Sequence, residues 1–380
     1  MTTLSHGRSS ISTSIPERRG MRFAMQYPSS LSIRTSSSGK ACFQTDECHA
    51  HARGQVVSDA KPPDSQQSDR RASDALSPRS GGLPRQPLNS NVRLHIAAAL
   101  RSVLKSIQDY RDFYANFTVR SAGSSSEKLI AAFSSTEREH YMGKGPWPIF
   151  VGSGYISTLS DDPRLIYQDV LVGLATDRGI NNGQPTLHAR CLTACSPTVG
   201  EVVVHIGAGT GYYTAILAAL VGDSGRVIAY EIEADLAERA RTNLRHIRTV
   251  KVVSASASAG ALPDADVIYV SAGATHPLAA WLNALNIGGR LIFPLTPNEG
   301  FGGMLMVTRR DVESYAASIV QRVAFIPCIG GRDDATSKAL TAALETQSIG
   351  KVKSLRRDAR PDGTAWCIGA GWWLSTAEHP

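Results

Sequence analysis

The apolar residues follow two different spacings along the chain, and the change falls near residue 183. Residues 91–120 carry apolar side chains three and four positions apart, which predicts an amphipathic helix. The pattern includes Leu94, Ile96, Ala97, Leu100, Val103, Leu104, Ile107 and Tyr110. Residues 127–142 predict a second helix, and residues 143–174, which are rich in Gly, Pro and aromatics, predict loops and short strands.

From residue 184 onward, short apolar runs alternate with helical patterns. The segments 200–207, 225–232, 250–255, 264–273 and 288–295 predict buried strands. The segments 184–196, 212–221, 233–247 and 277–286 predict helices. This alternation predicts an α/β fold with a doubly wound, mostly parallel sheet. Residues 304–310 and 318–328 predict further strands that give the sheet an antiparallel edge.

Charge is distributed unevenly between the first 90 residues and the rest of the chain. Residues 1–90 carry 12 Lys and Arg against 7 Asp and Glu, whereas the remainder carries 28 against 26. Few apolar runs and many Ser, Arg, Pro and Gln residues predict that 1–90 form a disordered basic tail. The nearly neutral remainder argues against a nucleic-acid-binding domain. The tail has two other interpretations: a weak electrostatic role, or a start of translation at Met21 or Met25.

Targeting signals and cysteines bear on the compartment. No apolar run reaches the roughly 20 residues of a membrane span, and the first 30 residues lack the apolar core of a secretory signal. Six irregularly spaced cysteines do not form a disulfide framework. We therefore expect a reduced, cytoplasmic protein without a membrane segment. An organelle transit segment is the alternative, against which the acidic residues of the N-terminus argue.

Candidate chemistry begins with the stretch HIGAGTGYYTA at residues 205–215. Gly207, Gly209 and Gly211 alternate in a loop between a predicted strand and a predicted helix. Glycines allow a ligand to approach the backbone, and the carboxyl edge of such a sheet is where ligands bind. A dinucleotide fingerprint requires a small residue where this chain has Tyr212, whose ring would obstruct a pyrophosphate. The loop therefore favours a ligand without phosphates.

An acidic residue follows at the spacing that a nucleoside requires. Glu231 lies 20 residues after Gly211, at the end of the next predicted strand, where a carboxylate can accept both hydroxyls of a ribose. The loop, the acid and the alternating elements together are typical of Rossmann-like class I methyltransferases that bind S-adenosyl-L-methionine. The alternative interpretation is a tight turn followed by a surface glutamate.

Residues 167–333 resemble the protein-L-isoaspartate O-methyltransferase family, with the similar segments in consecutive order. They are YQD at 167–169, QPTLHA at 184–189, HIGAGTGYYTAILA at 205–218, GRVIAYEIEADLAERARTNL at 225–244, DVIYVSAG at 266–273, LNIGGRLIFPL at 285–295 and FIPCIGGRD at 325–333. The resemblance implies a divergent member with the class I methyltransferase fold and with S-adenosyl-L-methionine as cofactor. It places Gly207, Gly209 and Gly211 at the methionine side of the cofactor. Glu231 and Ile232 fall at the ribose and adenine, and His188 falls near the cofactor.

Two positions depart from the family pattern. The family carries Ser or Thr two residues before the proline of its active-site helix, where it contacts the substrate carboxylate, and this chain has Gly183. Asn182 and Gln184 beside it, with Asn181 and Thr186, could supply hydrogen bonds instead. We therefore take Gly183, Asn182 and Gln184 as the candidate catalytic positions. Ser256 stands where the family has an Asp that holds the adenine amino group.

The predicted reaction is methyl transfer to a carboxylate of a protein or peptide, such as an isoaspartyl residue, with protein repair as its role. A carboxylate is ionised at pH 7, so the reaction requires positioning rather than a general base. The alternatives are a methyltransferase for another acceptor, such as a modified peptide or a small metabolite, and a non-catalytic cofactor-binding protein. The expected domains are the tail at 1–90, a helical extension at 91–160, the methyltransferase domain at 161–335 and a C-terminal extension at 336–380.

Two remaining clusters predict packing rather than chemistry. Cys191 and Cys195 share a helix face with His188, but two thiols do not complete a zinc site, so we expect buried residues and no metal. Trp366, Trp372 and Trp373 predict an apolar C-terminal strand or hairpin that packs on the core, with ligand stacking as the alternative.

Overall fold

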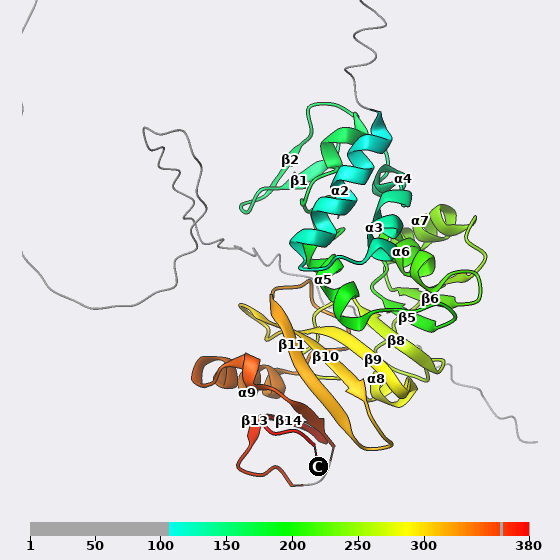
Figure 1. Ribbon diagram of the computed structural model, residues 1–380. Helices are drawn as coiled ribbons and strands as arrows, with labels where there is room; N and C mark the ends of the chain where they lie inside the picture. The colour runs from blue at the N-terminus through cyan, green and yellow to red at the C-terminus, as the bar shows by residue number, and fades with distance from the viewer. Residues whose placement is uncertain (1–105, 358–359, 380) are drawn as a thin grey trace, which may run out of the picture. The chain divides into compact units, whose positions relative to one another are not determined.

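The computed structural model describes residues 106–357 and 360–379. The tail predicted for 1–90 and the first part of the helix predicted for 91–120 lie outside these residues. The described residues belong to one compact unit, in which helices pack on a large central sheet (Figure 1).

The central sheet has ten strands in the order β13-β14-β12-β11-β10-β9-β8-β5-β6-β7. Five of them pair in parallel: β5 (Val202–Ile206), β6 (Arg226–Glu231), β7 (Val250–Ser254), β8 (Ala265–Val270) and β9 (Leu285–Leu295). The other five continue in antiparallel pairs: β10 (Gly302–Arg309), β11 (Tyr315–Val323), β12 (Ser354–Arg356), β13 (Ala365–Gly369) and β14 (Trp372–Ser375). The predicted fold class is confirmed, and the antiparallel part extends beyond the two predicted strands because the C-terminal residues add three more.

Strand β5 lies between β6 and β8, so the chain leaves it in one direction first and returns later on its other side. The carboxyl end of such a strand is the place where open α/β sheets bind ligands. Two small sheets lie outside the central one. They are formed by β1 (Pro148–Phe150) with β2 (Tyr155–Ser157), and by β3 (Gly173–Ala175) with β4 (Ile180–Asn181).

The helices of the α/β part follow the predicted segments. They are α5 (Pro185–Cys195), α6 (Tyr212–Val221), α7 (Ala234–Leu244) and α8 (Ala279–Ala284), followed by α9 (Asp334–Thr346). Helix α8 is shorter than predicted because Leu285 adopts an extended conformation and begins β9, where it pairs with Ala265. No helix within residues 106–357 and 360–379 is long and apolar enough to cross a membrane.

Three N-terminal helices cover one side of the sheet, α2 (Ile107–Ser121), α3 (Glu127–Ser135) and α4 (Arg138–Met142) (Figure 1). The single helix predicted for 127–142 is wrong. Thr136 and Glu137 adopt extended backbone conformations between α3 and α4, and the Thr136 hydroxyl donates to the carbonyl of Ala132 at 2.7 Å. Helix α2 begins with a capping box formed by Ser106 and Asp109.

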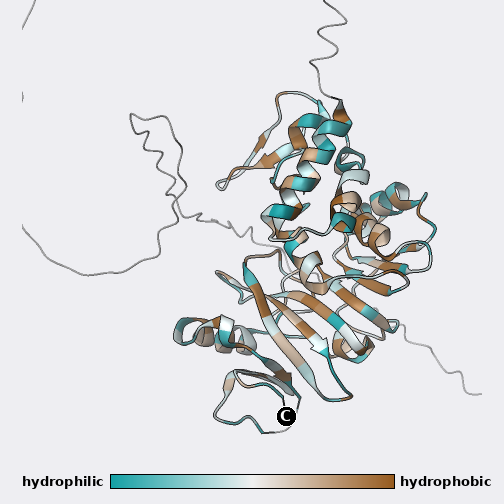
Figure 2. Ribbon diagram, viewed as in Figure 1, coloured by the Kyte–Doolittle hydropathy of each residue, from teal (hydrophilic) through white to brown (hydrophobic). Residues whose placement is uncertain are grey.

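The apolar core has two halves, one on each face of the sheet. Val203 of β5 and Val267 of β8 belong to the half under α2 to α6, whereas Val204 and Ile268, their next neighbours along the strands, belong to the other half. Alternate side chains of a strand point to opposite faces, so both faces of β5 and β8 are covered and these strands are mostly apolar (Figure 2). The C-terminal tryptophans, Trp366, Trp372 and Trp373, are buried in β13 and β14, as the packing hypothesis predicted.

Candidate active site

The glycine loop joins the carboxyl end of β5 to the start of α6. Gly207, Gly209 and Gly211 have φ angles of 77°, 56° and 96°. These lie in the left-handed region that side chains disfavour. The backbone N–H of Gly207 and that of Ala208 donate to the carbonyl of Tyr230 in β6, at 2.9 and 3.1 Å. The loop is therefore held against the neighbouring strand while Gly207 and Gly209 remain partly exposed.

The three glycines face different surroundings. A side chain on Gly211 would approach Leu244 of α7 to 2.6 Å, so this glycine is required by helix packing. A side chain on Gly209 would lie 3.3 Å from Leu174, whereas one on Gly207 would meet only ordinary contacts, the nearest at 3.4 Å. Gly207 and Gly209 thus leave bare, accessible backbone for a ligand. The sequence pattern alone did not separate these roles.

Glu231 is tied to this loop. It is 5% exposed, and its Oε2 accepts a hydrogen bond from the backbone N–H of Gly209 at 2.7 Å. Its Oε1 accepts from the backbone N–H of Glu233 at 2.9 Å. Burial raises the pKa of Glu231, and the backbone donors partly oppose that shift. The predicted pairing of the glycine loop with an acid at the end of β6 is present in the structure.

The predicted adenine side lies at the ends of the adjacent strands β6 and β7. Ile232 follows Glu231 and is 41% exposed, although it is a large apolar side chain. Ser256 follows β7 and its hydroxyl hydrogen-bonds that of Ser258 at 2.7 Å on the surface. Bare glycine backbone, a buried carboxylate and an exposed apolar side chain along one sheet edge suit a nucleoside with a ribose and an uncharged base.

The side chain of Tyr212 does not face the ligand side of the glycine loop. Its ring is fully buried, and its hydroxyl lies 3.2 Å from that of Tyr114 in α2. Phe133 and Tyr141 contact the same ring edge-to-face. Because the ring points under the N-terminal helices, it does not obstruct the ligand side of the loop. The prediction that the Tyr212 ring obstructs a pyrophosphate is therefore wrong.

The predicted acceptor residues lie around the start of α5. Gln184 donates from Nε2 to Asp169 at 2.8 Å, and the other oxygen of Asp169 accepts from the backbone N–H of Thr186 at 2.7 Å. The Gln184 amide therefore binds the carboxylate that also accepts a hydrogen bond from the first turn of α5. Asn182 is 8% exposed, and its Nδ2 has no hydrogen-bond partner among the described residues. Gly183 has a φ of 74°.

His188 is buried next to these residues. Its ring stacks on Tyr213 with centroids 3.7 Å apart, and its Nδ1 lies 2.8 Å from the hydroxyl of Tyr269. Burial lowers the pKa of His188 to about 3, so the ring is neutral at pH 7. Burial raises the pKa of Cys195 to about 12 and also raises that of Cys191. In the described part of the chain, no three His, Cys, Asp or Glu side chains gather as metal ligands do.

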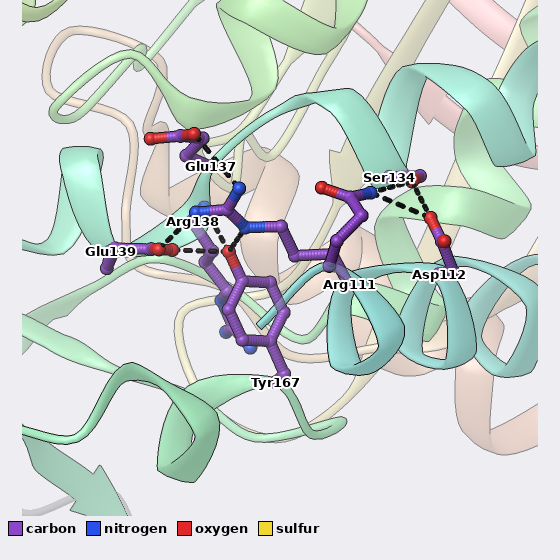
Figure 3. A network of polar contacts seen from close by, with 8 residues as sticks. Arg111, Asp112, Ser134, Glu137, Arg138, Glu139 and Tyr167 are labelled. Atoms are coloured by element: carbon purple, nitrogen blue, oxygen red, sulfur yellow. Dashed lines mark hydrogen bonds and ion pairs between the residues drawn. The ribbon is translucent and has the colours of Figure 1, made fainter. Parts of the chain in front are cut away.

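A polar network fastens the N-terminal helices to the segment that precedes α5 (Figure 3). The Tyr167 hydroxyl accepts from Nε of Arg111 at 3.0 Å and from the backbone N–H of Arg138 at 3.1 Å, and it donates to Glu139. Arg111 also forms ion pairs with Glu137 at 2.9 Å and with Glu139 at 2.6 Å. Tyr167 precedes Asp169 by two residues, so the network reaches the start of α5.

Arg138 is the buried centre of this attachment. It is 0% exposed, and its guanidinium donates to the backbone carbonyls of Ile166, Gln168 and Val170. The rings of Tyr114 and Tyr212 lie 5.6 and 6.0 Å from its Cζ. A lone arginine in a helical segment carries no periodic signal, and the sequence interpretation missed it. Arg138 therefore joins α4 to the segment that precedes α5.

The fold and the site define a class I methyltransferase, because the glycine loop, the acid of the next strand and the parallel sheet combine in the order that this class uses. The model of the family "Protein-L-isoaspartate(D-aspartate) O-methyltransferase (PCMT)" matches residues 118–333. This chain belongs to that family, and S-adenosyl-L-methionine is its cofactor.

Individual relatives carry the same family name. The protein-L-isoaspartate O-methyltransferase of Ignicoccus hospitalis is 31% identical over 43% of this chain and 79% of that protein. The one of Methanothermobacter thermautotrophicus is 31% identical over 34% of this chain and 62% of that protein. A putative protein-L-isoaspartate O-methyltransferase from Plasmodium falciparum, solved with S-adenosyl-L-homocysteine, is 17% identical, has a TM-score of 0.47, and matches 58% of this chain and 98% of that one.

Proposed function

We propose that this chain transfers a methyl group from S-adenosyl-L-methionine to a carboxylate of a protein or peptide, and that an isoaspartyl residue is the acceptor to test first. Family membership supports the reaction class. The observation that carries the proposal is the buried Glu231, which binds the loop of Gly207 and Gly209 and leaves their backbone partly exposed. Repair of damaged proteins in the cytoplasm is the role that follows.

Methyl transfer to a carboxylate requires that cofactor and acceptor are positioned against each other, and it requires no proton transfer from the acceptor. When bound, the cofactor supplies a methyl group on a positively charged sulfur. Glu231 would hold the sugar of the cofactor, the bare backbone at Gly207 and Gly209 would leave room for its methionine part, and Ile232 would contact its base. An acceptor carboxylate is already ionised at pH 7 and needs no base. The neutral His188, with its lowered pKa, is a poor base, which favours a carboxylate over an amine or a hydroxyl.

A second acceptor class rests on one specific feature. Gly183 provides no side chain where the family has a hydroxyl, and this favours an acceptor that differs from the isoaspartyl peptide, such as a modified peptide or a small metabolite. A cofactor-binding protein without catalysis is the remaining alternative, suggested by Ser256 in place of an acid.

Two measurements test the proposal in sequence. Isothermal titration with S-adenosyl-L-methionine should show one site, and absence of binding would reject every version of the proposal. Transfer of radiolabelled methyl is then measured with an isoaspartyl peptide and with the matched aspartyl peptide. Base-labile label on the isoaspartyl peptide alone supports the first acceptor. Cofactor binding without any label on either peptide would reject it and leave the second acceptor class and the protein without catalysis as the alternatives.

A further inference from the structure

The imidazole of His188 occupies the place where a side chain of residue 183 would begin. Gly183 adopts a left-handed conformation with φ of 74°. A side chain built on it would overlap Nε2 of His188, and the next nearest atoms belong to the same ring. The imidazole therefore points its Nε2 edge at the position where a side chain of residue 183 would begin. A glycine at 183 and a histidine at 188 depend on each other in this chain.

The ring that offers Nε2 is held in one orientation. It stacks nearly parallel on Tyr213, with an angle of 13° between the planes, and Phe325 contacts it edge-to-face. Nδ1 lies 2.8 Å from the Tyr269 hydroxyl. When that hydroxyl donates to Nδ1, the single proton of a neutral imidazole is on Nε2.

Two buried hydrogen-bonding groups without a partner among the described residues lie on this stretch of chain. The His188 ring forms its hydrogen bond with Tyr269 through Nδ1, and its Nε2 faces Gly183. Within residues 106–357 and 360–379, Nδ2 of Asn182 and Oγ1 of Thr186 are buried and unpartnered. Buried polar groups nearly always find partners, so the two unpartnered groups on Asn182 and Thr186 are available to a ligand.

The stretch also lies beside the cofactor loop. A side chain on Gly209 would contact Leu174, which is close before Gly183 in sequence. The Tyr213 hydroxyl, on the helix that follows the loop, lies 3.5 Å from the carbonyl of Gly183. A group bound at Gly183 is therefore next to the loop that receives the cofactor.

We infer that Nε2–H of His188 and Nδ2–H of Asn182 bind the acceptor carboxylate beside Gly183, and that Tyr269 is a positioning residue that keeps the proton on Nε2. This inference rests on the proposed function, because it supposes that the acceptor is a carboxylate. It explains why this chain has no hydroxyl at 183: the histidine takes over that contact and needs the space.

The first test separates acceptor binding from cofactor binding. His188→Phe keeps the stacking on Tyr213 and removes both ring nitrogens. We expect the KM for the carboxylate acceptor to rise ~10- to 100-fold, with kcat and the Kd of S-adenosyl-L-methionine changed less than ~3-fold. His188→Gln, which returns an N–H donor, should recover most of the loss. Tyr315→Phe, a buried tyrosine of β11 remote from the loop, is the matched control for Tyr269→Phe. Only Tyr269→Phe should raise KM.

The second test needs no acceptor. Nitrogen-15 NMR of histidine-labelled protein reports which ring nitrogen carries the proton, and the His188 signals are those lost in His188→Phe. Protonated Nε2 is expected, with a mixture of the two tautomers in Tyr269→Phe. A proton on Nδ1 of His188 overturns the inference, and so does an unchanged KM in His188→Phe. If the wild type binds cofactor but methylates no carboxylate, the proposed acceptor fails, while the NMR result still judges the arrangement of Tyr269 and His188.

Discussion

Glu231 connects the glycine loop to the start of α7, because its two oxygens accept hydrogen bonds from Gly209 and Glu233. Glu231→Gln replaces one acceptor oxygen with a donor and removes the charge. We expect ~10- to 100-fold weaker binding of S-adenosyl-L-methionine, since hydrogen bonds to a charged group contribute about 1.5–3 kcal/mol. Isothermal titration measures the change. Glu238→Gln, on the exposed face of α7, should leave the affinity unchanged; equal affinities in the two variants would contradict the role of Glu231.

The glycines of the loop predict two different defects. Gly211→Ala forces a methyl group onto Leu244 at a φ of 96°, so we expect a loss of about 2–4 kcal/mol in the free energy of unfolding. A methyl group at position 207 meets no such overlap. Gly207→Ala should therefore weaken cofactor binding more clearly than it lowers the free energy of unfolding. Urea unfolding and cofactor titration of both variants separate the two effects. Gly211→Ala combined with Leu244→Ala should recover part of the overlap penalty. A Gly211→Ala protein as stable as the wild type would show that helix packing does not require this glycine.

At the scale of elements, Tyr167 joins the N-terminal helices to the segment that precedes α5. Tyr167→Phe removes the hydroxyl that contacts Arg111, Arg138 and Glu139. We expect about 1–3 kcal/mol of destabilisation, because the partly buried side chains of Arg111 and Glu139 and the backbone N–H of Arg138 each lose a hydrogen bond. Hydrogen exchange should accelerate in α2 and α4 and stay unchanged in β5 and β6. Tyr110→Phe, on the exposed side of α2, is the control and should change neither; uniform acceleration across the sheet would contradict a local attachment.

The sequence patterns correctly predicted the elements whose conformation is determined by residues close together in the chain. Strands β5 and β6 and helix α6 follow from apolar runs, turn glycines and helical spacing within a few residues. The break between α3 and α4 did not, because neither Gly nor Pro marks Thr136 or Glu137. Arg138 holds three carbonyls of a distant segment there, and tertiary contacts decide the local conformation.

The same distinction holds for the candidate site: relations that follow from strand order were predictable, and those that depend on tertiary contacts were not. Spacing alone placed Glu231 beside the glycine loop, since adjacent parallel strands end at one sheet edge. The relation between Gly183 and His188 was not predictable, because it depends on a left-handed backbone that brings residue 183 against a ring five residues later. From the sequence alone, the missing hydroxyl at 183 could only be interpreted as a lost contact. The structure shows that the imidazole of His188 occupies the place of the missing side chain.

At the scale of the whole molecule, two buried neutral histidines make stability depend on pH. Burial lowers the pKa of His188 and of His205 to about 3, and His205 lies between the hydroxyls of Thr214 and Ser271. The unfolded chain binds protons on both below about pH 6.5, while the folded chain does not until about pH 3. The unfolded state therefore holds more protons in this window, and stability falls as the pH falls through it.

Each buried histidine should contribute a decrease of about 1.4 kcal/mol per pH unit below pH 6 to the free energy of unfolding. Urea unfolding at pH 7.0, 6.0, 5.5 and 5.0 measures the slope, and carboxylates add a common background. His205→Gln and His188→Gln should each flatten it by about one histidine's share, whereas His246→Gln, at an exposed position, should retain the full slope. Parallel slopes in all four proteins would mean that the two rings take up protons in the folded state. That result would remove the low pKa of His188, which is one of the observations that favour a carboxylate acceptor.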